Sequence, residues 1–201
     1  MLFVGGNIIY KNLKVSKEKV IQEECCAGRD FTVMGDIYNY GTIKNRHGGL
    51  TVYAYGNVYN FNQFSVNWLV MRSNNNTLKL SGIYNSNLSF EKSGGTSANI
   101  QIDGLVKVNY RFVINTGVTL TLGGSSELSV NKTIENNGAL VNNGKITNRY
   151  YIYSSGQVDS HKEMKLVPWI YDRSTSDSLI ITVNNNVVHP KMSSSINSLI
   201  S

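Results

Sequence analysis

The stretch from Ile134 to Val158, IENNGALVNNGKITNRYYIYSSGQV, decides the fold. Within it an aliphatic residue recurs at every sixth position, namely at Ile134, Leu140, Ile146, Ile152 and Val158. A period of six fits neither an α-helix with 3.6 residues per turn nor a simple hairpin with a tight turn. It fits short extended segments that turn a corner repeatedly and place one side chain inward on each face. The stretch therefore predicts the rungs of a β-solenoid.

The residues between these aliphatic positions are good corner residues. Gly138, Gly144 and Gly156 each stand two residues before an aliphatic one, and the first two follow an Asn-Asn pair. Asn tolerates left-handed backbone angles, and Gly adopts them without steric penalty. Rows of Asn or Thr along such a coil can also stack into hydrogen-bonded ladders.

Looser echoes of the same pattern precede this stretch. Gly-Asp-Ile-Tyr-Asn at 35–39 returns as Gly-Asn-Val-Tyr-Asn at 56–60, and Gly-Ile-Tyr-Asn, shorter by one residue, occupies 82–85. Such internal repeats indicate stacked units that bury a core only together. We therefore predict an all-β protein, a single-stranded β-helix (β-solenoid) of about five to six coils over residues 35–158. A β-sandwich or jelly roll is the alternative.

The two ends of the chain are expected to differ from this body. Residues 1–34 are predicted to form an N-terminal arm and cap, in which 15–24 is either a short helix or one more strand. Residues 159–201 are predicted to form a C-terminal cap followed by a hairpin and tail, with strands at 179–183 and 187–188. The apolar residues Phe3, Val4, Ile8 and Ile9 form either a first strand of the fold or an arm that adds to a neighbouring subunit's sheet.

Cys25 and Cys26 are the only cysteines. Adjacent cysteines rarely bond to each other, because the small ring strains the peptide link. The pair also lacks the C-x-x-C spacing of zinc and redox sites. Three interpretations stay open: buried reduced thiols, cross-links between subunits, or metal and redox chemistry.

Acidic residues are too sparse to predict catalysis. Enzymes built on parallel β-helices usually need clustered carboxylates or calcium-binding aspartates. Between Asp36 and Glu127 the chain holds only Glu91 and Asp103, and their spacing does not place them together on adjacent coils. We expect no enzyme activity, no catalytic residue, no metal site and no cofactor.

Charge and hydrophobicity limit the possible partners. The net charge of +6 can attract nucleic acid, acidic glycans or anionic membranes, but Lys and Arg are scattered, so nucleic acid is not expected. No window reaches about 18 consecutive apolar residues, so no membrane insertion is expected. No signal peptide is seen. We expect a protein made in the cytoplasm that ends on a spore, virion or cell surface, or in an inclusion.

A row of aromatic residues flanks the predicted inward positions. The row consists of Tyr38, Tyr40, Tyr53, Tyr55, Tyr59, Phe61 and Tyr84, and several of these side chains should point outward. Exposed rings one coil apart suit glycan stacking or packing against another subunit. The competing interpretation is that they cover seams between strands. Both stay open, and the tyrosines are the candidate interaction surface.

The Asn-Asn-Gly hexads and the Gly-x-Ile-x-Asn rungs of residues 35–158 resemble the loose β-helical repeats of bacterial surface adhesins and of phage tail-spike or fibre proteins. The resemblance implies a rigid, extended, non-catalytic body that presents a surface or builds a larger structure. We expect a self-assembling structural protein, as a homo-oligomer or polymer in a fibre, a spore or virion surface layer, or a protein crystal. The alternatives are a glycan-binding adhesion module and a polysaccharide-cleaving enzyme.

Overall fold

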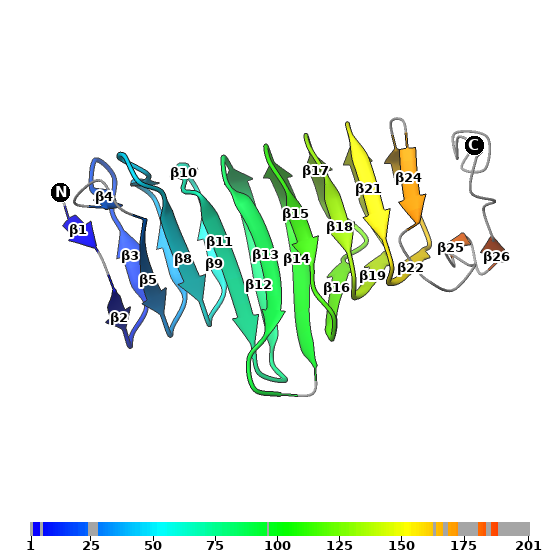
Figure 1. Ribbon diagram of the computed structural model, residues 1–201, viewed down its shortest axis with the longest axis horizontal. Helices are drawn as coiled ribbons and strands as arrows, with labels where there is room; N and C mark the ends of the chain where they lie inside the picture. The colour runs from blue at the N-terminus through cyan, green and yellow to red at the C-terminus, as the bar shows by residue number, and fades with distance from the viewer. Residues whose placement is uncertain are drawn as a thin grey trace.

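A computed structural model describes residues 2–4, 6–23, 28–95, 97–162, 164–166, 169–172, 181–183 and 186–188. All regular elements in these ranges are β-strands, and consecutive coils pair in parallel. The strands stack as rungs along the long axis from β1 to β24 (Figure 1). The predicted β-solenoid is confirmed, with about seven turns rather than five to six.

Three sheets form the faces of the solenoid. The first contains β1 (Leu2–Val4), β4 (Val20–Glu23), β7 (Thr42–Lys44) and β10 (Gln63–Ser65). The second contains nine strands, β2 (Asn7–Ile9), β5 (Arg29–Val33), β8 (Leu50–Ala54), β11 (Trp68–Ser73), β13 (Asn87–Lys92), β15 (Phe112–Ile114), β18 (Ile134–Asn136), β21 (Tyr151–Ser154) and β24 (Trp169–Asp172).

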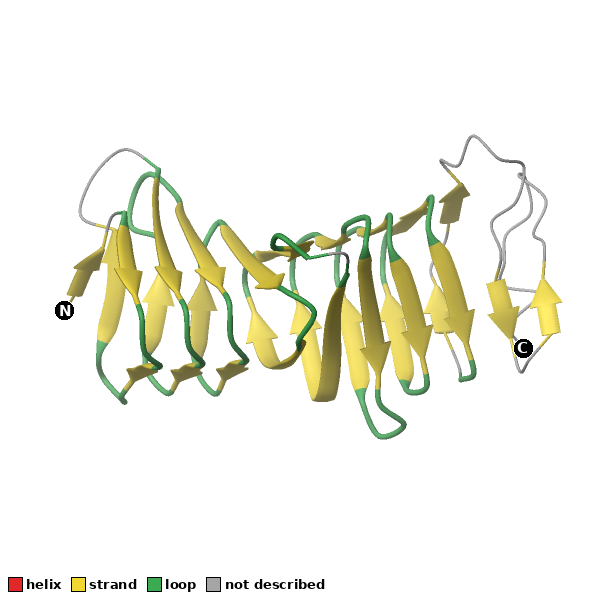
Figure 2. Cartoon of the chain, turned by 90° about the horizontal axis from the view of Figure 1, so that it is seen from below, coloured by secondary structure: helices red, strands yellow, loops and turns green. Residues whose placement is uncertain are grey.

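The third sheet has thirteen strands, because the long strands β12 and β14 turn from one face to the next. Its main path contains β3 (Leu13–Val15), β6 (Ile37–Asn39), β9 (Val58–Asn60), β12 (Thr77–Tyr84), β14 (Ala98–Val108), β16 (Val118–Leu122), β19 (Ala139–Asn142), β22 (Gln157–Ser160), β25 (Ile181–Val183) and β26 (Asn186–Val188). Its side branch contains β17 (Glu127–Val130), β20 (Lys145–Asn148) and β23 (Met164–Leu166). Seen from below, the strands lie in a near and a far layer, and each strand runs across the long axis of the solenoid (Figure 2).

The hexads explain the regular end of the stack. Ile134 pairs with Ile152, Leu140 with Val158 and Ile146 with Met164, so three hexads make one coil. Each hexad places one aliphatic side chain inward on one face, and those from Ile134 to Val158 are at most 4% exposed. Among the described side chains, they belong to one continuous apolar core that runs from Val15 to Met164.

Glycine at the hexad corners is needed for a different reason from the one predicted. Gly138, Gly144 and Gly156 are not among the residues with positive φ, so the expected left-handed angles are wrong there. A Cβ atom on Gly156 would instead lie 2.0 Å from the carbonyl oxygen of Gly138, and one on Gly138 would lie 2.3 Å from the carbonyl oxygen of Val118. The corners of successive coils approach so closely that no side chain fits between them.

The predicted asparagine ladders are present inside the corners. The buried Asn39 side chain donates from Nδ2 to Oδ1 of Asn60 at 2.7 Å. Further along, Asn136 donates to the Ser154 hydroxyl at 3.1 Å and Asn142 to that of Ser160 at 2.9 Å. These bonds satisfy amides that would be costly to bury unpaired.

The coils extend past residues 35–158 on both sides. Residues 20–23 form strand β4 rather than a helix, and β2, β3 and β4 join the same sheets as the body. β23 and β24 continue the coils after Val158, which explains the higher coil count. The predicted hairpin is confirmed by the antiparallel pairing of β25 with β26. Within the described ranges, no helix has the length and apolar character needed to span a membrane.

Candidate binding surface of stacked aromatic rings

The parallel register brings four of the aromatic residues together in pairs. Tyr38 of β6 lies beside Tyr59 of β9, and the two rings stack with centroids 5.2 Å apart and an interplanar angle of 20°. Two residues further on, Tyr40 stacks on Phe61 at 4.6 Å and 7°. Both distances are close to the spacing of neighbouring strands, about 4.8 Å, because equivalent positions of successive coils lie directly above one another.

Tyr38 is held by its own chain. Its hydroxyl group donates to Oδ2 of Asp36 at 3.1 Å. This hydrogen bond, together with partial burial, raises the pKa of Tyr38 above its usual value.

Tyr53 and Tyr55 lie on a different face and help to cover it. The guanidinium carbon of Arg72 lies 4.2 Å from the centroid of the Tyr53 ring, and Nε of Arg72 donates to Glu91 at 3.0 Å. Burial lowers the pKa of Arg72, but hydrogen bonds to Tyr55 and Glu91 raise it, and the net direction is upward. These tyrosines thus support the interpretation in which rings cover the seams between strands.

A second cluster of the same kind covers the next coils of this face. The Arg111 guanidinium lies 5.7 Å from the Trp68 ring, and its Nη2 donates to both carboxylate oxygens of Glu135, at 2.7 and 2.8 Å. Beneath these clusters the outward-facing Val70 and Val113 are only 6% and 7% exposed. The second sheet is therefore closed by its own side chains over these coils.

The predicted outward position of Tyr84 is wrong. Its side chain is fully buried in the core, and its hydroxyl group donates to the Ser81 carbonyl at 2.7 Å. Burial raises its pKa well above 10.0. Leu80 of β12, and not Ile83, pairs with the inward Val58, so inward and outward residues alternate from Leu80 and place Tyr84 on the inner face. Ile83 consequently points outward and is 47% exposed.

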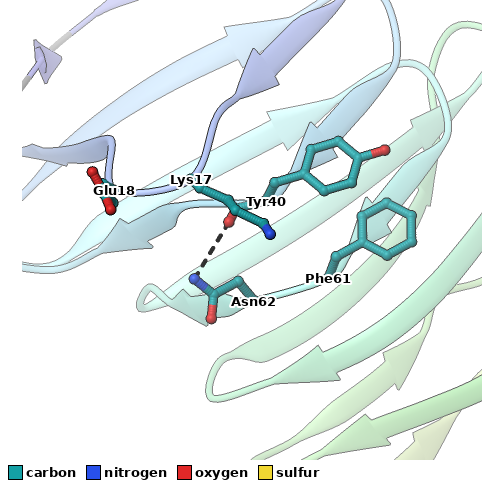
Figure 3. Close-up of a pocket in the computed structure, with 5 residues that line it drawn as sticks. All are labelled: Lys17, Glu18, Tyr40, Phe61 and Asn62. Atoms are coloured by element: carbon teal, nitrogen blue, oxygen red, sulfur yellow. Dashed lines mark hydrogen bonds between the residues drawn. The ribbon is translucent and has the colours of Figure 1, made fainter.

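A pocket lies beside the Tyr40–Phe61 stack, with a volume of about 440 Å³ (Figure 3). The turn between β3 and β4 contributes Lys17 and Glu18, while Phe61 and Asn62 follow β9. Figure 3 shows the two rings side by side, with Lys17 and Asn62 next to them and Glu18 on the far side. Asn62 donates to the Tyr40 carbonyl at 3.4 Å. We name these five residues the aromatic pocket.

Phe61 is the most informative residue of the aromatic pocket. Its side chain is 59% exposed, which is unusual for a large apolar ring. Phe61 stacks on Tyr40, and the Lys14 ammonium group lies 5.8 Å from the centroid of the Tyr40 ring. The sequence contains a signal for this stack, the 21-residue offset between the two Tyr-Asn repeats, but no signal for the turn that supplies Lys17.

The other candidate residues lie near the N-terminus. Phe3 and Val4 belong to β1, which pairs with β4, and Ile8 and Ile9 belong to β2, which pairs with β5. Ile8 is 53% exposed, and Ile9 packs against the core. Cys25 and Cys26 lie outside the described residues.

Glu23 is a buried carboxylate that sequence reasoning missed. Its Oε1 accepts hydrogen bonds from the backbone N–H groups of Arg46, His47 at 2.6 Å and Gly48 at 3.2 Å. Burial raises the pKa of Glu23, but these backbone hydrogen bonds lower it, and the net direction is downward. This carboxylate ties the end of β4 to the corner of the next coil.

The described part of the chain contains no group of three or more His, Cys, Asp or Glu side chains arranged to hold a metal ion. No family model, curated protein or solved structure matches this chain. Interpretation of its function therefore depends on the geometry above.

Proposed function

We propose that the protein is a non-catalytic structural subunit that assembles by strand addition at its first coil. One observation carries the proposal: among the described residues, β1, β2 and β3 each pair with a strand on one side only. No described strand pairs with the backbone groups along the other side of these strands. Exposed sheet edges of this kind are templates for strand addition.

The side chains of the first coil support the same proposal. Ile8 is 53% exposed, while Ile9 and Leu13 are only partly covered and pack against the core. An added strand would bury this apolar surface in the same way as each coil buries the previous one. Neither of the two prolines, Pro168 and Pro190, lies in the first coil, where proline would block pairing.

A charged side chain in the edge strand tests the proposal. We expect light scattering and negative-stain microscopy to reveal assemblies of the unmodified chain, and monomers of Ile8→Lys, because an exposed lysine disfavours edge-to-edge pairing. Ile83→Lys is the matched control, since Ile83 is similarly exposed but lies several coils away. Monomers of the unmodified chain, or equal assembly of Ile8→Lys, would contradict the proposal.

A second candidate function, saccharide binding, is favoured by the exposed Phe61 ring beside the aromatic pocket. Exposed aromatic rings next to polar groups are a common feature of small-molecule sites. The third alternative, polysaccharide cleavage, needs clustered carboxylates. We found no observation among the described residues that favours it.

A further inference from the structure

We propose that the aromatic pocket binds an acidic saccharide, with a sugar ring against Phe61 and its carboxylate on Lys17. This inference rests on the second candidate function, saccharide binding, and is independent of assembly through the first coil. It names both the residues of the site and the chemical class of the ligand.

The ring of Phe61 provides a fixed apolar platform. It stacks almost parallel on Tyr40, at 4.6 Å and 7°, and both residues follow paired strands of neighbouring coils. The stack covers one face of the Phe61 ring, yet the side chain remains 59% exposed. One face of a pyranose consists of C–H groups, which can cover such a ring while the hydroxyl groups stay in water.

Polar groups lie at one side of the Phe61 ring. Asn62 uses one N–H group for its bond to the Tyr40 carbonyl, which orients its amide beside the rings. Lys17 has no ion-pair partner in the described part of the chain, and Figure 3 shows its ammonium group next to Asn62. An aromatic wall with a few convergent hydrogen-bonding groups matches the general form of a ligand site.

The charge of the site favours an anionic ligand. Lys14 and Lys17 flank Tyr40, whereas Glu18 is the single acid that lines the aromatic pocket. Two lysines further along the coils are each paired with an acid, since Lys79 pairs with Asp103 at 3.0 Å and Lys145 with Glu127 at 3.4 Å. The excess positive charge at the pocket suits one carboxylate.

The turn that carries Lys17 has an unusual backbone. Glu18 has a φ of 63°, a left-handed angle that disfavours residues other than glycine and asparagine. A hydrogen bond from Lys19 N–H to the Ser16 carbonyl, at 3.1 Å, closes the turn. Strained positions of this kind occur disproportionately at ligand-binding sites.

A single-stranded nucleic acid also combines rings with negative charge, but the geometry favours a sugar. The two rings are in contact, so a base cannot insert between them and could stack only on the outer face of Phe61. Strands of nucleic acid also need cations that follow their backbone, and Lys and Arg are scattered along this chain.

Isothermal titration of the full chain with matched tetrasaccharides tests the inference. The probes are oligomers of galacturonic acid and mannuronic acid and their neutral counterparts, galactose and mannose. We expect at least one acidic oligomer to bind about tenfold more tightly than its neutral counterpart, because Lys17 adds a charge-assisted contact. Phe61→Ala should weaken both classes about tenfold, because it removes the platform. Lys17→Gln should abolish only the preference for acid.

Tyr110→Ala is the matched control, since Tyr110 is an exposed aromatic residue (48%) that does not line the aromatic pocket. Equal affinity for acidic and neutral sugars would overturn the acidic class and leave saccharide binding intact. Absence of binding to all four sugars would overturn both. Tighter binding of oligothymidylate that is lost in Phe61→Ala would assign the pocket to nucleic acid instead. Circular dichroism of each variant confirms that the fold is kept.

Discussion

Tyr84 shows that a repeat in the sequence can lie out of register with the rungs of the structure. The repeat at 82–85 lacks the residue that separates Gly from Ile or Val at 35–39 and 56–60. In the structure Leu80 pairs with Val58, so Ile-Tyr-Asn at 83–85 lies three residues beyond the equivalent positions. Because three is an odd number, Ile83 takes the outward place and the tyrosine ring enters the core, where it meets Phe64 edge-on at 5.4 Å. The similarity of the residues predicts the wrong register here, because the sequence does not show which residues of neighbouring coils pair.

The buried hydroxyl group of Tyr84 should be measurable in stability. We expect Tyr84→Phe to lower the free energy of unfolding by about 1 kcal/mol in urea titrations at neutral pH, since the bond to the Ser81 carbonyl is lost. Tyr38→Phe loses a surface bond to Asp36 and should cost less. An equal cost for both variants would show that burial of the hydroxyl group does not matter.

Glu23 should make the free energy of unfolding depend on pH. Because its pKa is lowered in the folded state, the ionised form stabilises the fold above the ordinary value of 4.5, and this contribution is lost as pH falls through the lowered value. We expect Glu23→Gln to lower the free energy of unfolding by about 1–2 kcal/mol at pH 7. Below pH 4.5 the free energy of unfolding of this variant should depend less steeply on pH than that of the unmodified chain. Urea titrations at pH 3 to 7 measure both. A parallel pH profile for the two proteins would contradict the role of this carboxylate.

At the scale of elements, the corners are the tightest points of the stack. A Cβ atom on Gly156 would lie 2.0 Å from the Gly138 carbonyl oxygen, so the coils must separate locally. We expect Gly156→Ala to lower the free energy of unfolding by about 1–3 kcal/mol, seen as a lower Tm. Gly124→Ala is the control, because its nearest neighbour is 3.7 Å away. A similar Tm for both variants would contradict the close-approach explanation.

The elements differ in how far the sequence predicts them. The hexads predict β18 to β22 well, because one aliphatic residue per six is enough to define three faces. The coil beyond Val158 was missed, although Ile170 repeats Ile152 at the right distance, because Met164 replaces an aliphatic residue and no Asn-Asn-Gly corner precedes it. The Tyr40–Phe61 stack follows from the repeat spacing. The Lys17–Glu18 turn does not, since it repeats no other segment of the chain.

At the scale of the whole molecule, stability comes from neighbours along one axis. Each coil contacts only the coils before and after it, so the core is a row of layers rather than a sphere. Among the described strands, those of the first coil pair with a neighbour on one side only. The function that we propose uses the first of these layers, and the role of Cys25 and Cys26 as cross-links stays a prediction.

Because three hexads form one coil, the length of this part of the solenoid changes in fixed steps. One coil from Ile134 to Ile152 returns every face to the same orientation and advances the stack by one strand spacing, about 4.8 Å. Length is thereby quantised: whole coils can be added or removed without altering the cross-section, whereas a fraction of a coil would rotate every later face. Between Ile134 and Met164 the distance between two features is set by counting hexads in threes.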